Sequence, residues 1–130
     1  TGVQTCALPI YLKKHAKVEW VNYAGLPDHA DHGLVQKYMG GRASGILSFG
    51  VKGGFEAGGR FQDALKLITR LVNIGDAKSL ACHPASTTHR QLSPAELAKA
   101  GVSPDMVRLS IGIEHIDDII ADLEQALAAV

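Results

Sequence analysis

The chain has 130 residues, of which 46% are hydrophobic and 20% charged, as is ordinary for one compact globular domain. Its 13 basic and 13 acidic side chains balance and aromatic residues are only 5%, so neither a nucleic-acid platform nor attraction to an anionic membrane is expected. No stretch approaches the roughly 20 apolar residues of a membrane helix. With only Cys6 and Cys82, a disulfide framework is excluded and a reducing cytosol is the expected compartment.

The first ten residues read TGVQTCALPI, with no initiator Met and none of the basic residues that open a signal peptide. We expect residues 1–10 to be a non-native leader, which would make Cys6 irrelevant to function, and residues 11–130 to form the domain. The short basic run over residues 11–15 is expected to be the end of a helix.

One helix and two strands are expected in the first half of the domain. Alternation at residues 18–20 predicts a half-buried strand over 17–22. Asp28 is expected to cap a helix that runs to about residue 39. Its predicted apolar face consists of Leu34, Val35, Tyr38 and Met39. Eight glycines between residues 40 and 59 surround a second predicted strand over 46–51.

The second half alternates between helices and short strands. Apolar residues at three- and four-residue steps predict a helix over 61–72, ended at residues 73–75, where a short strand is expected to begin. A further strand is expected over 79–82. The run Ser93-Pro94-Ala95-Glu96 is a capping box with proline at the first helical position, which predicts a short helix to about Ala100, closed by Gly101.

The last two elements are a strand over 107–111 and a helix over 116–129. Alternation in the strand places Arg108 and Ser110 on one face, and Asp117 and Asp118 suit the positive end of the helix dipole. The whole pattern predicts an α/β sandwich, with a sheet of about four strands covered by helices on one face.

Structural interpretations are favoured for several motifs that resemble chemical sites. The turn at 50–54 lacks the spacing of a phosphate-binding loop. His29 and His32 share a helix face, but no third metal ligand has a fixed spacing to them. His83 and His89 flank a hydroxyl-rich loop, where they would act as catalytic bases or satisfy the local backbone. Cys82 is expected to be buried and structural.

Arg108 is the most informative single residue, because it lies between Val107 and Leu109 in an apolar strand. A guanidinium in that position needs an anionic partner, since leaving it unpaired would be costly. Glu114 would supply that partner in a structural ion pair, whereas a ligand carboxylate would be held bidentately. The residue pattern alone favours neither alternative.

Three segments in order resemble a known family: VNIGDAKSL at 72–80, HPASTTH at 83–89 and RLSIGIE at 108–114. They are similar to the carboxy-terminal domain of the Cys/Met-metabolism enzymes that use pyridoxal phosphate, a group of fold-type-I proteins. The first two segments, together with WVNYAGLP at 20–27 and GVKGG at 50–54, are most similar to the O-acetylhomoserine sulfhydrylase branch. The resemblance covers about residues 11–130.

This resemblance implies roles for three residues. Arg108 would bind the α-carboxylate of an amino-acid substrate, Asn73 would lie beside substrate and cofactor, and Thr88 would lie near the same carboxylate. The implied reaction is a γ-replacement that makes homocysteine or methionine from O-acetylhomoserine and sulfide or a thiol. The implied cofactor is pyridoxal 5′-phosphate, bound by a large amino-terminal domain, and relatives are usually homotetramers.

The chain departs from the family in lacking the motif of the cofactor-binding lysine. None of its eight lysines matches that motif: Lys13, Lys14, Lys17, Lys37, Lys52, Lys66, Lys78 and Lys99. We therefore predict no catalytic, cofactor-binding or metal-binding residue within the chain, and no activity of the chain alone. Three alternatives remain open: a cystathionine γ-synthase, cystathionine γ-lyase or methionine γ-lyase; a non-catalytic stand-alone binding module; and a metal-dependent hydrolase built on the histidines.

Overall fold

The structure, a computed structural model, describes residues 2–130, with side chains from residue 6 onward. A single open sheet has the strand order β1-β2-β5-β4-β3, and every neighbouring pair is antiparallel except β3 with β4. The elements are α1 (Gly2–Lys14), β1 (Val18–Asn22), α2 (His32–Met39), β2 (Ile46–Val51), α3 (Gly54–Ala64), β3 (Thr69–Arg70), β4 (Leu80–Cys82), the 3-10 helix η1 (Pro84–Ser86), α4 (Pro94–Lys99), β5 (Met106–Ser110) and α5 (Ile116–Ala128).

Alternation along the central strands separates a core face from an open face. Leu47 and Phe49 of β2 pair with Leu109 and Val107 of β5, and these four side chains are at most 2% exposed. The intervening residues of the same strands point the other way. The sheet therefore has one apolar side that must be covered and one mixed side.

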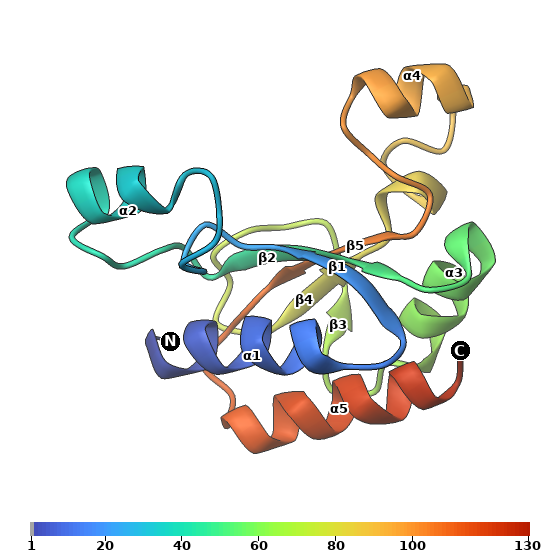
Figure 1. The fold of residues 1–130 in the computed structure, drawn as a ribbon. Coiled ribbons are helices and arrows are strands. Elements are labelled where there is room, and N and C mark those ends of the chain that lie inside the picture. The colour runs from blue at the N-terminus through green and yellow to red at the C-terminus, as the bar shows by residue number, and fades with distance from the viewer. Residues whose placement is uncertain (1) are drawn as a thin grey trace.

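Three helices supply the cover of the core face. Leu8 and Leu12 of α1, Phe61 of α3 and Leu123 of α5 are all completely buried in one cluster with the strand residues. The rings of Phe49 and Phe61 meet edge to face, with centroids 5.5 Å apart. Figure 1 shows α1 and α5 beneath the sheet, whereas α2 and α4 project from its opposite side. The predicted α/β sandwich is confirmed, with five strands in place of about four.

The predicted helix over 61–72 is wrong in both of its bounds, because α3 starts at Gly54 and ends at Ala64. The buried carboxylate of Asp122 accepts hydrogen bonds from the backbone amides of residues 66, 67 and 68, at 2.9, 3.0 and 2.8 Å. Amides held in this way cannot continue a helix. The chain leaves the helix and forms β3 at Thr69–Arg70, so the short strand precedes residues 73–75.

The predicted helix from Asp28 also begins too early. The segment from Leu26 to Asp31 forms turns, and α2 starts at His32 with no side-chain cap. Of its predicted apolar face only Val35 is buried, while Leu34, Tyr38 and Met39 are exposed. The capping box at Ser93 and Glu96 is confirmed, and so are the strands over 46–51, 79–82 and 107–111 to within one or two residues.

The amino-terminal segment is helical, and α1 includes most of the predicted leader. Leu8 packs in the core, Cys6 is exposed, and Thr1 lies outside the described residues. That residues 1–10 are non-native stays a prediction. Among the described residues, no helix is long and apolar enough to cross a membrane.

Candidate functional site

A cleft of about 530 Å³ lies on the open face of the sheet, with Arg108 of the central strand β5 in its wall. Strand register places Ser48 of β2 on one side of Arg108 and Cys82 of β4 on the other, and all three line the cleft. Met106 and the 100–102 segment after α4 contribute further lining. Because the neighbouring strands offer small side chains there, the guanidinium is left accessible from the open side.

The guanidinium of Arg108 donates a hydrogen bond from Nη2 to the backbone carbonyl of Asn73, 3.4 Å away. Asn73 is exposed and is not among the lining residues of the cleft. The structure thus brings Asn73 to Arg108 through its main chain. A guanidinium has five N–H donors, so this contact leaves others to pair with a bound carboxylate.

Thr88 and His89 line the same cleft from the segment that follows η1. The hydroxyl of Thr88 lies 2.7 Å from Nδ1 of His89, and the amide of His89 donates to the carbonyl of Pro84 at 2.9 Å. The compact turn at 84–89 therefore places a hydroxyl and an imidazole in the cleft with the guanidinium. Sequence reasoning weighed His89 as a catalytic base and favoured a structural role for it, and it missed Ser48, since strand order is needed to place that residue.

Glu114, the alternative partner considered for Arg108, holds the start of β4. Its carboxylate accepts hydrogen bonds from the amide and the hydroxyl of Ser79, at 2.7 and 2.8 Å. Burial alone would raise the pKa of Glu114, but these two hydrogen bonds, together with one from its own backbone amide, outweigh burial and leave the pKa below its usual value. Both carboxylate oxygens therefore have a structural use at the end of the 71–79 loop.

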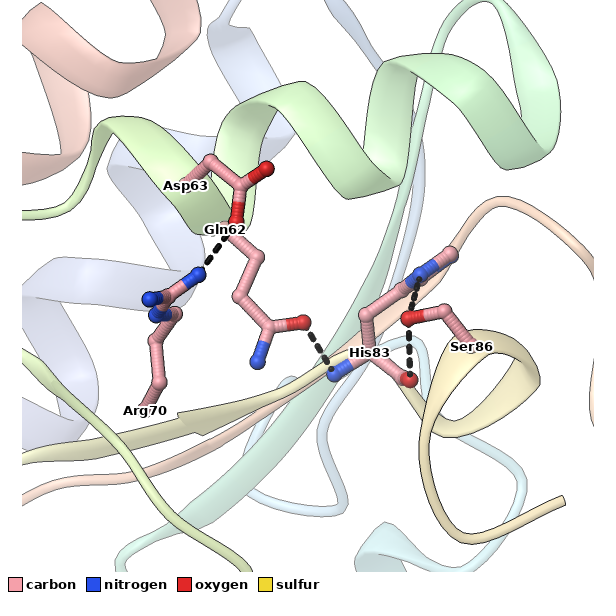
Figure 2. Close-up of polar contacts among 5 residues, drawn as sticks. All are labelled: Gln62, Asp63, Arg70, His83 and Ser86. Carbon is pink, nitrogen blue, oxygen red and sulfur yellow. Dashed lines mark hydrogen bonds and ion pairs between the residues drawn. The ribbon is translucent and has the colours of Figure 1, made fainter. Parts of the chain in front are cut away.

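His83 is a structural histidine. It is completely buried, with Nε2 2.8 Å from the carbonyl of Pro104 and Nδ1 2.8 Å from the hydroxyl of Ser86. Figure 2 shows the Ser86 contact and the side-chain oxygen of Gln62, which accepts the amide of His83 at 3.0 Å. With both ring nitrogens occupied by the protein, His83 has no free position for proton transfer.

Cys82 is 3% exposed, as expected for a structural thiol, and its Sγ lies 3.3 Å from the hydroxyl of Thr87. The histidines do not gather around a common centre. Within residues 2–130, no group of three or more His, Cys, Asp or Glu side chains could hold a metal ion. The metal-dependent hydrolase therefore has no support in the described part of the chain.

The cleft does not provide a covalent anchor for a cofactor aldehyde. No lysine is found among the described residues that line it. Lys52, in the glycine-rich turn, donates from Nζ to the carbonyl of Ala16 at 2.7 Å. The residues present fit a carboxylate and do not fit pyridoxal phosphate as a covalently held group.

Known proteins resemble the chain over nearly all of its length. The family model described as Cys/Met metabolism PLP-dependent enzyme matches residues 3–128. O-acetyl-L-homoserine sulfhydrylase 1 of Thermus thermophilus is 56% identical over 124 residues, which are 95% of this chain and 30% of the relative. Homocysteine synthase of Schizosaccharomyces pombe is 52% identical over 121 residues, 93% of this chain and 28% of the relative.

Two solved structures share the fold. One from Campylobacter jejuni, described as an O-acetylhomoserine (thiol)-lyase, carries a pyridoxyl-lysine phosphate at its own position 205. It superposes with a TM-score of 0.89 at 44% identity, over 98% of this chain and 30% of that one. A cystathionine gamma lyase from Micromonospora echinospora superposes with a TM-score of 0.86 at 35% identity, over 98% of this chain and 33% of that one. The chain thus spans about a third or less of these relatives.

Proposed function

Because this chain belongs to the family of Cys/Met metabolism PLP-dependent enzymes, we propose that it is the substrate-carboxylate-binding part of an O-acetylhomoserine sulfhydrylase. The intact enzyme would make homocysteine or methionine from O-acetylhomoserine and sulfide or a thiol. The observation that carries the proposal is the accessible guanidinium of Arg108 on the central strand of the open face, in a chain 56% identical to a sulfhydrylase.

The chain's own contribution is to bind and orient the substrate. A bidentate pair between Arg108 and the α-carboxylate fixes two oxygens in the plane of the guanidinium, which fixes the position of the carboxylate and of Cα in the cleft. Thr88, which lines the cleft, would offer its hydroxyl to the same carboxylate, and Asn73 would lie beside the substrate, because its backbone carbonyl accepts a hydrogen bond from Arg108. When bound, the cofactor supplies an electron sink for the reaction.

The cofactor and the remaining contacts are proposed to come from a part of the polypeptide that this chain does not span. The relatives are more than three times as long as the segments matched here, which leaves room for a domain with the cofactor lysine. We propose a homotetramer for the intact protein and the cytosol as its location. We propose no nucleic-acid partner and no membrane partner for it.

A second candidate is γ-elimination in place of γ-replacement. The likeness to a cystathionine gamma lyase, at 35% identity, supports it. The same carboxylate contact would serve both reactions, so Arg108 does not separate them. Product analysis does: with sulfide present, the sulfhydrylase gives homocysteine, whereas a lyase gives a keto acid and ammonia from its sulfur amino-acid substrate.

The test uses the chain alone and a chimaera. With O-acetyl-L-homoserine, sulfide and pyridoxal phosphate, the 130-residue chain is expected to form no homocysteine, because it brings no lysine to the cleft. A chimaera carries this chain in place of the 124 matching residues of the Thermus thermophilus relative and is expected to form homocysteine. Turnover by the chain alone, or a folded, cofactor-loaded chimaera that gives no homocysteine, would refute the proposal.

A further inference from the structure

The segment 73–75 runs beside the open face, where two side chains of β5 hold it. Nη2 of Arg108 donates to the carbonyl of Asn73 at 3.4 Å, and the hydroxyl of Ser110 accepts from the amide of Gly75 at 3.2 Å. Residues two apart on a strand point to the same side. The two contacts therefore hold both ends of the segment against the open face of the sheet.

The far end of the same loop is fixed independently. The hydroxyl of Ser79 accepts from the amide of Gly112 at 3.0 Å and donates to Glu114, and the carbonyl of Ala77 accepts from the amide of Ile113 at 2.9 Å. These bonds leave the turn at Gly75, whose φ is +78°, to be held by Ser110. Ser110 is 3% exposed, so its hydroxyl is shielded from competing water.

The contact between Arg108 and Asn73 is long for a hydrogen bond, and on its own it would orient the guanidinium weakly. The contact orients the guanidinium only when the carbonyl of Asn73 is kept in place. Ser110 supplies this, because it anchors the chain only two residues further on. Loss of that anchor would free the long Arg108 side chain, which would then have to be ordered when a carboxylate binds.

We propose that Ser110 is a positioning residue for substrate binding. It holds the 73–75 turn, the turn holds the guanidinium of Arg108, and the oriented guanidinium receives the carboxylate. The last step rests on the proposed function. The first two concern only contacts within the chain.

Steady-state kinetics of the chimaera test the last step. Ser110→Ala is expected to raise the KM for O-acetyl-L-homoserine about three- to tenfold, the cost of ordering one long side chain, with kcat changed less than about twofold. Ser110→Thr keeps the hydroxyl and is expected to restore most of the affinity. Ser103→Ala is the matched control, because the Ser103 hydroxyl is buried without a hydrogen-bond partner in the described structure.

Amide exchange and the Arg108 Nε–Hε signal test the first two steps without turnover, and both are followed by NMR in the 130-residue chain at a concentration where light scattering gives the mass of one chain. In Ser110→Ala the Gly75 amide is expected to exchange at least about tenfold faster, and the Arg108 signal is expected to shift and broaden. Unchanged Gly75 and Arg108 signals would overturn the inference, and so would a changed kcat with an unchanged KM. If the wild-type chimaera makes no homocysteine, the proposed function fails, and the NMR result alone decides whether Ser110 positions Arg108.

Discussion

At the scale of single residues, the contrast between Arg108 and an equivalent lysine tests the site. In the chimaera, Arg108→Lys is expected to lower kcat/KM about 30- to 1000-fold, a loss of about 2–4 kcal/mol in transition-state stabilisation, because an ammonium cannot reproduce the planar two-pronged contact. Arg60→Lys is the matched control, since Arg60 is exposed on α3 and lies outside the cleft. Steady-state rates with O-acetyl-L-homoserine and sulfide give kcat/KM for both variants. An unchanged kcat/KM for Arg108→Lys would remove this residue from the site.

Glu114 allows a second test at this scale, in the pH dependence of stability. Burial opposes its charge, but the Ser79 hydrogen bonds leave the pKa lowered in the folded chain. A carboxyl group with a lowered folded-state pKa stabilises the fold above its unfolded pKa and loses that contribution as pH falls through the folded value. Urea denaturation is therefore expected to show Glu114→Gln less stable than wild type at pH 7, with the difference shrinking below about pH 4. A difference independent of pH would contradict this account.

At the scale of elements, the loop between α3 and β3 depends on one carboxylate. Asp122→Asn keeps the shape but replaces an acceptor oxygen with a donor beside the three amides of residues 66–68, so about 3 kcal/mol of unfolding free energy is expected to be lost. Asp63→Asn is the control, because its ion pair with Arg70 is exposed and is worth about 1 kcal/mol at most. Equal losses in the two variants, measured by urea denaturation, would show that Asp122 does not fix this loop.

The same carboxylate shows where sequence reasoning stops. Apolar spacing predicted a helix through residue 72, and the signal that ends it at Ala64 comes from Asp122, more than fifty residues further along the chain. Local patterns succeed where the cause is local, as with the capping box at Ser93 and the alternation that puts Arg108 and Ser110 on one face. The cleft cannot be predicted from local patterns, because only the β2-β5-β4 strand order brings Ser48 and Cys82 to either side of Arg108.

At the scale of the whole molecule, the described part of the chain exposes a group of apolar side chains. Leu71, Val72 and Ile74 follow one another closely beside the edge strand β3, and they are 49%, 50% and 56% exposed. Apolar residues grouped on a surface mark an interface or a tendency to associate. The relatives have two-thirds or more of their length outside the matched segment, and in a longer polypeptide such a part is large enough to cover these side chains.

The 130-residue chain by itself is therefore expected to self-associate. Light scattering coupled to gel filtration should give an apparent mass that rises with concentration above the 13.8 kDa of one chain. The double variant Val72→Lys with Ile74→Lys should shift the chain toward the monomer, because two charges would have to be buried in any contact through this surface. Gln36→Lys with Gln91→Lys adds the same charge at exposed polar positions and should leave association unchanged. If both double variants reduce association equally, net charge is the cause, and the Leu71–Ile74 surface is not the contact.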